Sequence, residues 1–294
     1  MRWPIRSTVS RLSYKPNTRQ LGTRCKMALD PASPERKQEI KDCLGAIRER
    51  VATASSSSPT LVAVSKYKPA GDILACHELG HLDFGENYVQ ELEEKAKILP
   101  SDIRWHFIGT LQSNKAKTLA LIPNLYSIQT LGSVKAANAL NKALSSDRTT
   151  PLRVLLQVNT SGEDAKSGLP PLSSSEDVSA SELGKLAAHV IRECPALRLE
   201  GLMTIGSLEL SIHASETEKN ADFERLKQTR DILKAYLETT FGEDGTKQWG
   251  QEGTGKLLLS MGMSSDFETA LKAGSDIIRV GSSIFGGRPP KPTT

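Results

Sequence analysis

The sequence predicts an α/β protein: a single (β/α)8 barrel of the TIM type with an extra helix before its first strand. Short, almost continuously apolar runs alternate with helical stretches, a pattern typical of strands buried on both faces of a parallel sheet. Eight such runs follow one another, the number that closes this barrel. The competing architecture is an open doubly wound sheet. It is weakened because no G-x-G-x-x-G follows the first run.

The first predicted element is a helix over Pro34–Thr53. Ser33 directly precedes it and is a favourable N-cap residue. Apolar residues recur inside it at helical spacing, at Ile40, Leu44, Ile47 and Val51. A linker, Ser55–Pro59, then leads to the first strand.

The remaining elements alternate in type. The predicted strands are Leu61–Ser65, Leu82–Gly85, Trp105–Gly109, Leu125–Gln129, Val154–Asn159, Leu199–Ile205, Lys256–Met261 and Ile277–Val280. The predicted helices between them are Tyr88–Leu99, Asn114–Leu121, Val134–Leu144, Ser181–Cys194, Glu216–Thr239 and Asp266–Ala273. Two stretches rich in Ser, Pro or Gly, Gly168–Ser181 and Phe241–Gly255, are interpreted as surface insertions.

The composition fits one domain with a sizeable core. Hydrophobic residues make up 38% of the 294 residues, and the mean hydropathy is −0.33. No apolar run approaches the roughly 18 residues that span a bilayer, so we expect no membrane association. The four cysteines form no C-x-x-C pair, which argues against a metal site or a disulfide framework: Cys25, Cys43, Cys76 and Cys194.

Residues 1–33 form a basic leader. Seven basic residues and no acidic one lie between Met1 and Leu29, and removing these seven from the formal charge of +4 leaves about −3. The chain therefore carries no general basic face for nucleic acid. The leader resembles a mitochondrial presequence in composition; the alternatives are a disordered tail or residues upstream of a start at Met27. We expect a cytoplasmic or mitochondrial location, or both, with the barrel over residues 34–288 and a tail over 289–294.

Lys66 is the first candidate site residue. It follows the apolar run that begins at Leu61, so alternation along the strand puts it on the same face as Val62 and Val64. If that face points into the barrel, the amine lies at the carboxyl-terminal mouth and is partly desolvated, which favours its nucleophilic free form. The alternative is a solvated lysine at a strand end.

The last two strand–loop junctions provide a second candidate feature. Loops after the seventh and eighth barrel strands frequently bind phosphate, and here they contain the Ser264 hydroxyl and Gly281, which allows close backbone approach. The alternative is an ordinary pair of turns. Arg279 lies inside the last apolar run, and a buried arginine needs a partner, either a carboxylate or a cofactor ring.

Polar residues also follow most of the other strands. Asn87 and Tyr88 follow the second strand, and His106, which alternates with two aromatic residues, points inward in the third. A histidine in such a run is also compatible with a satisfied core residue. Further polar groups at the strand ends are Gln112, Ser113, Asn114, Lys115, Asn159, Glu163, Lys166 and Thr204, beside Met203. Their common position is where barrel enzymes keep their sites.

At these residues the sequence resembles the pyridoxal phosphate homeostasis protein family, single-domain relatives of the alanine racemase N-terminal barrel. The matching segments run in order over about residues 34–288. They are Val62–Pro69, Phe84–Glu91, Trp105–Gly109 with Leu111–Lys115, Gln157–Asn159 with Lys166–Gly168, Gly201–Ile205, and Leu259–Ser264 through Phe285–Gly286. One departure is Thr110, where many relatives have proline.

The resemblance implies a fold-type III barrel for pyridoxal 5'-phosphate, without the C-terminal β domain of the racemases. It implies a Schiff base on Lys66 and a phosphate held by Ser264, Gly281 and Ser282. It also implies that Arg279 approaches the pyridine nitrogen. Three further residues are expected at the cofactor, namely Asn87, His106 and Met203. No catalytic residue and no metal ligand is assigned.

The function implied is buffering or delivery of pyridoxal phosphate rather than fast catalysis. Arginine does not readily give up its proton, so the facing ring nitrogen stays unprotonated and the ring is a weak electron sink. The chain ends at Thr294, which leaves no room for the racemases' second domain. The alternatives are a racemase or decarboxylase of low activity, and a Schiff-base aldolase acting on sugar phosphates. Expected partners are the cofactor and apo-enzymes that use it, with the chain a monomer or weak dimer.

Overall fold

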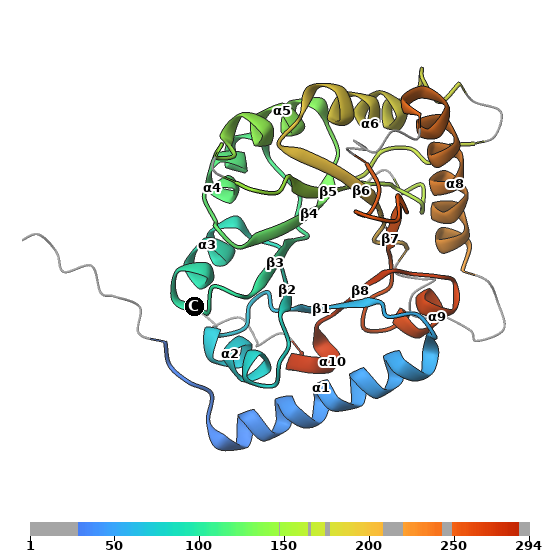
Figure 1. Cartoon of the computed structure of the whole chain (residues 1–294). Helices are drawn as coiled ribbons and strands as arrows, with labels where there is room; N and C mark the ends of the chain where they lie inside the picture. Colours follow the sequence, from blue (N-terminus) through green and yellow to red (C-terminus); the bar gives the residue numbers. More distant parts are fainter. Residues whose placement is uncertain are drawn as a thin grey trace, which may run out of the picture.

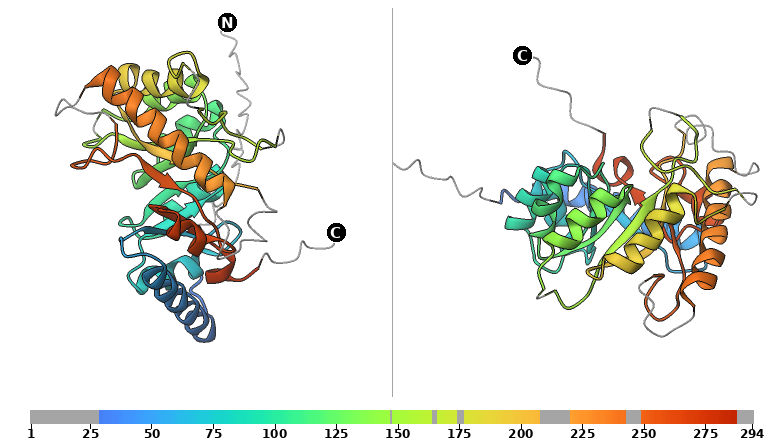
Figure 2. Two further views of the ribbon diagram at one scale, coloured as in Figure 1. Left: turned by 90° about the vertical axis from the view of Figure 1, so that its right-hand side faces the viewer. Right: turned by 90° about the horizontal axis from the view of Figure 1, so that it is seen from above.

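The chain folds into a closed barrel of eight parallel strands. The computed structural model describes residues 29–146, 148–163, 166–173, 177–207, 220–242 and 249–287. The strands follow one another in chain order, and β8 pairs with β1 to close the ring. Helices surround the strands on the outside (Figures 1 and 2). The predicted (β/α)8 barrel is confirmed.

All eight predicted strands are present. Their bounds are β1 Thr60–Val64, β2 Asp83–Glu86, β3 Arg104–Phe107, β4 Leu125–Leu131, β5 Leu152–Gln157, β6 Leu197–Met203, β7 Leu258–Ser260 and β8 Ile277–Val280. β5 and β6 begin two residues before the predicted starts because each contains an arginine that the apolar pattern excluded. Tertiary partners accommodate both: Arg153 Nε donates to Glu200 Oε1 at 2.9 Å, and Arg198 Nε donates to the Gly250 carbonyl at 2.8 Å.

The described helices are α1 Pro34–Ala54, α2 Ala70–Glu78, α3 Val89–Ile98, η1 Ser113–Lys115, α4 Ala116–Ala120, α5 Val134–Ala143, α6 Glu182–Glu193, α8 Ala221–Phe241, α9 Phe267–Lys272 and α10 Ser282–Phe285. Helix α2 is missing from the predicted segments because its nine residues include a glycine and little helical patterning. The predicted start of α8 at Glu216 lies outside the described residues. Within the described chain, no helix combines the length and the apolar character needed to cross a membrane.

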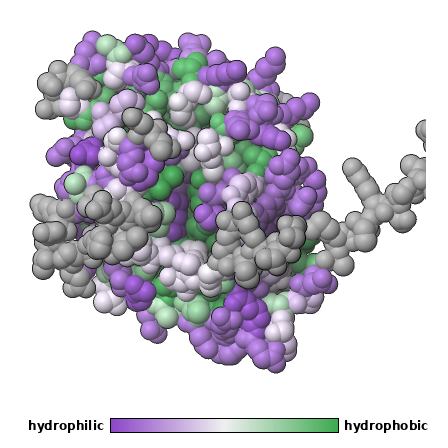
Figure 3. All heavy atoms as spheres, turned by 180° about the vertical axis from the view of Figure 1, so that it is seen from behind, coloured by the Kyte–Doolittle hydropathy of each residue, from purple (hydrophilic) through white to green (hydrophobic). Residues whose placement is uncertain are grey.

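Two hydrophobic layers hold the barrel. The larger one fills the space between the strands and the surrounding helices, with Trp105, Phe84 and Phe107 fully buried in it. A smaller cluster lies inside the barrel and consists of Val62, Leu155, Met203 and Ile277. The face seen in Figure 3 is mainly hydrophilic, with smaller hydrophobic areas around a central hollow.

The extra N-terminal helix α1 packs against α2, α9 and α10 along the lower edge of the barrel in Figure 1. Its start is capped by Ser33, whose Oγ accepts from Arg36 N at 3.2 Å. The Arg36 guanidinium donates to Asp72 Oδ2 of α2 at 2.7 Å and to the Phe285 carbonyl at the end of α10 at 2.8 Å. The Arg36 side chain therefore links α1 to α2, which follows β1, and to α10, which follows β8.

Replacing Arg36 with methionine is expected to lower the free energy of unfolding by about 2 kcal/mol, because the substitution leaves the carboxylate of Asp72 without its cation in a nearly buried place. The control is Lys37→Met on the same helix. Its ion pair with Glu78 is exposed on both sides, so its loss should cost under about 1 kcal/mol. Urea unfolding of the two variants measures both values. Equal losses would show that Arg36 contributes no more than a surface charge.

Candidate functional site

Lys66 lies just beyond the end of β1, in a tight turn at the carboxyl-terminal mouth of the barrel. Lys68 N donates to the Ser65 carbonyl at 3.0 Å and closes the turn. Tyr67 has a φ of 62°, the left-handed region that residues with a side chain rarely adopt. Lys66 itself is exposed, so the partial desolvation expected from the sequence is not found. The strand ends before this residue, so Lys66 lies in the turn and not in the barrel wall.

A pocket of about 320 Å³ joins Lys66 to the last strand–loop junction. Its lining residues are Val64, Lys66, Tyr67, Lys68, Tyr88, Gly281, Ser282 and Gly286. Three of the predicted cofactor residues, Lys66, Gly281 and Ser282, therefore share one cavity. Lys66 is more than 200 positions away from the other two in the chain, and the pairing of β1 with β8 brings them together.

The two predicted phosphate loops meet in the structure. Gly281 N donates to Ser264 Oγ at 3.1 Å, which ties the loop after β7 to the loop after β8. A Cβ at Gly281 would lie 3.1 Å from the Val64 carbonyl oxygen and 3.2 Å from Val64 Cβ, a tight approach on the β1 side. Glycine thus lets the backbone after β8 approach the mouth closely.

Arg279 is buried inside the barrel below these loops and is 4% exposed. Its guanidinium donates to Ser260 Oγ at 2.5 Å and to the Thr204 carbonyl at 2.8 Å. Among the described residues no carboxylate lies within ion-pair distance of Arg279, and burial lowers the pKa of Arg279 to about 10. Of the two partners that the sequence allows, the direct carboxylate is not found, and a buried cation of this kind fits an anionic ligand.

His106 lies deeper in the barrel than the sequence suggests. Its Nε2 is 3.0 Å from Asp83 Oδ1, and its Nδ1 is 2.8 Å from Ser127 Oγ and 3.1 Å from Gln129 Nε2. It lines a pocket at the amino-terminal end, with the strand starts Thr60 and Ile277, and not the pocket of Lys66. Its expected place at the mouth is thereby corrected: alternation gives the direction of a side chain but not its depth.

His106 is nevertheless linked to Arg279. Ser260 Oγ, which accepts from Arg279, donates to Gln129 Oε1 at 2.7 Å, and Gln129 reaches His106. The geometry favours an indirect role for His106, through Gln129 and Ser260. Met203 lies in the inner hydrophobic cluster beneath the mouth, at 1% exposure.

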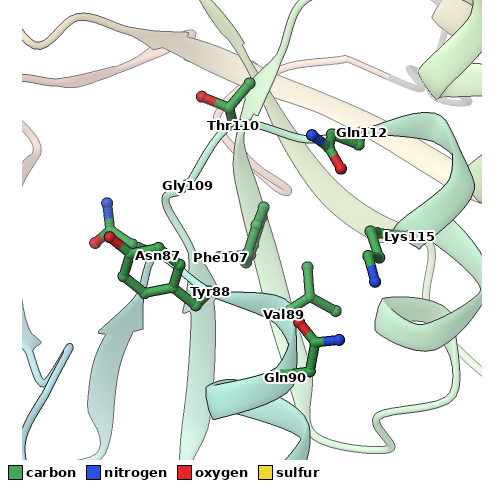
Figure 4. A pocket seen from close by; sticks show the side chains of 9 residues that line it. All are labelled: Asn87, Tyr88, Val89, Gln90, Phe107, Gly109, Thr110, Gln112 and Lys115. Atoms are coloured by element: carbon green, nitrogen blue, oxygen red, sulfur yellow. The ribbon is translucent and has the colours of Figure 1, made fainter.

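Asn87 belongs to a second pocket beside that of Lys66. This pocket has a volume of about 360 Å³ and is lined by Asn87, Tyr88, Val89, Gln90, Phe107, Gly109, Thr110, Gln112 and Lys115 (Figure 4). Tyr88 lines both pockets. Asn87 Oδ1 is buried and has no hydrogen-bond partner within the described part of the chain. Polar residues after β2 and after β3, among them Asn87, Gln112 and Lys115, therefore line one pocket, which adjoins the Lys66 pocket rather than forming part of it.

Sequence reasoning missed a buried ionic cluster that contacts Ser65, the residue before Lys66. Glu86 is 0% exposed, and its Oε1 accepts from Ser65 Oγ at 2.7 Å and from Lys95 Nζ at 2.6 Å. Lys95 also donates to Glu91 Oε1 at 2.7 Å. Alternation along β2 places Glu86 on the same outer face as Phe84, where an acid is unexpected, and this conflict is the signal that could have identified it.

The fold and the site define a class: single-barrel proteins with a lysine pocket at the mouth, bordered by the loops after the last two strands. The family model for the alanine racemase N-terminal domain matches residues 43–289. Two curated relatives are named pyridoxal phosphate homeostasis protein. The one from Schizosaccharomyces pombe is 41% identical over 85% of this chain and 93% of its own length, and the one from Caenorhabditis elegans is 43% identical over 85% and 96%.

Solved structures agree with this placement. PipY of Synechococcus elongatus, in a structure described as having PLP bound, has a TM-score of 0.61 and 28% identity, and the match covers 84% of this chain and 100% of PipY. The alanine racemase of Corynebacterium glutamicum shares the fold, with a TM-score of 0.60 at 13% identity over 88% of this chain and 64% of that one. The chain belongs to the alanine racemase N-terminal domain family and, within it, to the pyridoxal phosphate homeostasis proteins.

Proposed function

We propose that this chain binds pyridoxal 5'-phosphate and acts in intracellular vitamin B6 homeostasis, buffering the cofactor or delivering it to enzymes that use it. The observation that carries the proposal is the pocket in which Lys66 lies with Gly281 and Ser282. The names of the relatives and the PLP described for PipY support it.

The residues present fit such a group. Lys66 is exposed and has an amine that would hold the cofactor covalently, and the cofactor would supply the aldehyde for that link. Ser264, Gly281 and Ser282 provide hydroxyl and backbone groups for the phosphate. Arg279 is a buried cation with no carboxylate within ion-pair distance in the described chain, where Asp266 attracts it from a longer distance, and this arrangement suits a ligand carrying negative charge.

Arg279 also gives the reason for storage rather than turnover. The guanidinium would approach the ring nitrogen without transferring its proton to it, so a bound ring would be a weak electron sink. Asn87 and Met203 remain proposed wall residues of the site, and His106 acts through the hydrogen bonds of Gln129 and Ser260.

Arg279→Met is expected to weaken cofactor binding about 30-fold, because a hydrogen-bonded charge is worth roughly 2 kcal/mol. Absorbance titration of the apo-protein with pyridoxal phosphate measures the dissociation constant. The control is Arg192→Met on the exposed face of α6, which should bind as the wild type does. Unchanged affinity in Arg279→Met would remove this residue from the site.

A transfer assay separates buffering from delivery. The loaded protein is mixed with an apo-enzyme that needs pyridoxal phosphate, in the presence of a phosphatase that destroys free cofactor. Activation of the enzyme under these conditions indicates direct delivery, and activation only without phosphatase indicates buffering. A purified protein that shows no Schiff-base absorption after incubation with pyridoxal phosphate would end the proposal.

A racemase or decarboxylase of low activity is the second candidate. One observation favours it: the Tyr67 and Tyr88 hydroxyls are hydrogen-bonded to each other at the rim of the Lys66 pocket, where a proton donor is needed. Incubation of the loaded protein with L-amino acids in deuterated water tests it: an absence of α-proton exchange excludes the racemase, and an absence of released CO2 and amine product excludes the decarboxylase.

We also propose a cytoplasmic or mitochondrial location, or both, and a monomer or weak dimer that meets apo-enzymes as partners. The basic composition of residues 1–29 supports the mitochondrial alternative. A reporter fused to these residues tests import, and sedimentation at several concentrations tests association. Residues 1–28 lie outside the described part of the chain.

A further inference from the structure

Two side chains of helix α3 form hydrogen bonds with the backbone of the turn that contains Lys66. On one side, Lys95 Nζ donates to the Ser65 carbonyl at 2.8 Å. On the other side, Glu91 Oε1 accepts from the backbone amide of Tyr67 at 2.6 Å. These two contacts reach the residues immediately before and after Lys66, so the backbone of the lysine is fixed by groups from a neighbouring helix.

The same two side chains belong to one buried ionic cluster. Lys95 bridges Glu86 and Glu91, at 2.6 Å and 2.7 Å, and its side chain is only 8% exposed. Glu86 in turn accepts from Ser65 Oγ, which adds a third contact to the turn. A buried cluster of this kind is rigid because each member would leave an uncompensated charge or polar group if it moved.

The backbone of the turn needs such support. Tyr67 occupies the left-handed region, at a φ of 62°, although it carries a side chain and is not Asn, Asp or Gly. Unusual backbone conformations of this kind persist where the surroundings impose them, and they concentrate at functional sites. The bond from Tyr67 N to Glu91 acts directly on the residue that carries the strain.

We propose that Glu86, Lys95 and Glu91 form a positioning cluster that holds the strained Ser65–Lys68 turn and thereby sets how readily the Lys66 amine reacts with the cofactor. The proposal rests on the function proposed above. None of the three cluster residues lines the Lys66 pocket; they act through the backbone of the residues on each side of Lys66. When the hold is lost, Tyr67 relaxes toward an ordinary backbone conformation and the amine leaves its reactive position.

The test compares four substitutions in the full chain. Glu91→Ala removes the acceptor at the Tyr67 amide, and because Glu91 is partly exposed the fold should survive. Glu91→Gln removes the charge but keeps an acceptor oxygen. Glu94→Ala is the matched control: it lies exposed on the same helix and loses the same charge. Tyr67→Gly relieves the strain directly, since glycine tolerates a positive φ.

The first readout is the rate of Schiff-base formation when pyridoxal phosphate is added to the apo-protein, followed by absorbance, with thermal unfolding measured alongside. Glu91→Ala is expected to be about tenfold slower than wild type, because small displacements of a reacting group carry penalties of this size or larger. The rate of Schiff-base formation in Glu91→Gln should be within about threefold of the wild-type rate, and the rate in Glu94→Ala should equal the wild-type rate. Equal rates in Glu91→Ala and Glu94→Ala overturn the proposal.

The second readout does not involve the cofactor. Amide hydrogen exchange in the peptide that contains Tyr67 should accelerate in Glu91→Ala and not in Glu94→Ala. The double variant Tyr67→Gly with Glu91→Ala should form the Schiff base less than about threefold more slowly than Tyr67→Gly alone, because glycine has already removed the strain that Glu91 opposes. This comparison also provides a test if Glu91→Ala alone fails to fold. A wild-type protein that forms no Schiff base defeats the proposed function, whereas a wild type that reacts while Glu91→Ala reacts equally fast defeats only this inference.

Discussion

Replacing Lys66 with alanine is expected to abolish the Schiff-base absorption of the protein completely. The side chain is the exposed amine of the pocket that also contains Gly281 and Ser282. Without it, the cofactor can be held only by non-covalent contacts to its phosphate and ring, so affinity should fall at least 100-fold, the loss that corresponds to roughly 3 kcal/mol. Borohydride reduction followed by peptide mass spectrometry measures where the pyridoxyl group resides.

Lys68 is the second amine in this pocket, and the experiment must distinguish it from Lys66. Burial lowers the pKa of Lys68, which makes its free amine more available. Its Nζ, however, donates to the Phe285 and Gly287 carbonyls at 2.9 Å and 2.7 Å, so it is turned toward the end of α10. We expect Lys68→Ala to keep the Schiff base. A pyridoxyl group on Lys68 in the wild type would contradict the assignment of Lys66.

The second large effect is expected at Glu86. Burial is the leading cause that raises the pKa of Glu86, and Glu91 also raises it, while Lys95 and Ser65 lower it. The net result is a rise of the pKa from the ordinary value of 4.5 to about 7. Glu86 Oε2 has no hydrogen-bond partner among the residues that the structure describes. Because the folded pKa lies above the unfolded one, the native state binds the proton more tightly. The stabilisation from this proton is therefore complete below pH 4.5 and is lost as the pH rises through 7.

Glu86→Gln removes this titration while it keeps the shape of the side chain. Between about pH 4 and pH 8, its stability relative to wild type should rise by about 3 kcal/mol, since one pKa unit corresponds to about 1.4 kcal/mol. Urea unfolding at a series of pH values measures the difference between the two proteins, in which titrations common to both cancel. Glu94→Gln, exposed on α3, should show no such slope. A constant difference between Glu86→Gln and wild type across this range would show that Glu86 titrates normally.

Much of this protein could be predicted from local pattern. The eight strands, their order and the position of Lys66 after the first one follow from short apolar runs separated by helical stretches, because burial on both faces leaves a mark in each segment separately. Gly281 and Ser264 could be placed at the same mouth for a similar reason: every strand of a parallel barrel points its carboxyl end to one side.

What the sequence by itself determined is therefore the barrel, its strand order and the end at which the candidate residues gather. Only the tertiary structure decided the depth of His106, the pairing of Glu86 with Lys95 and the contacts of α3 with the Lys66 turn. It also decided that Arg36 reaches Phe285 across 249 positions of the chain. The physical reason is that these features depend on strand register, strand bounds and barrel closure, which set distances between segments and leave no periodicity within any one of them.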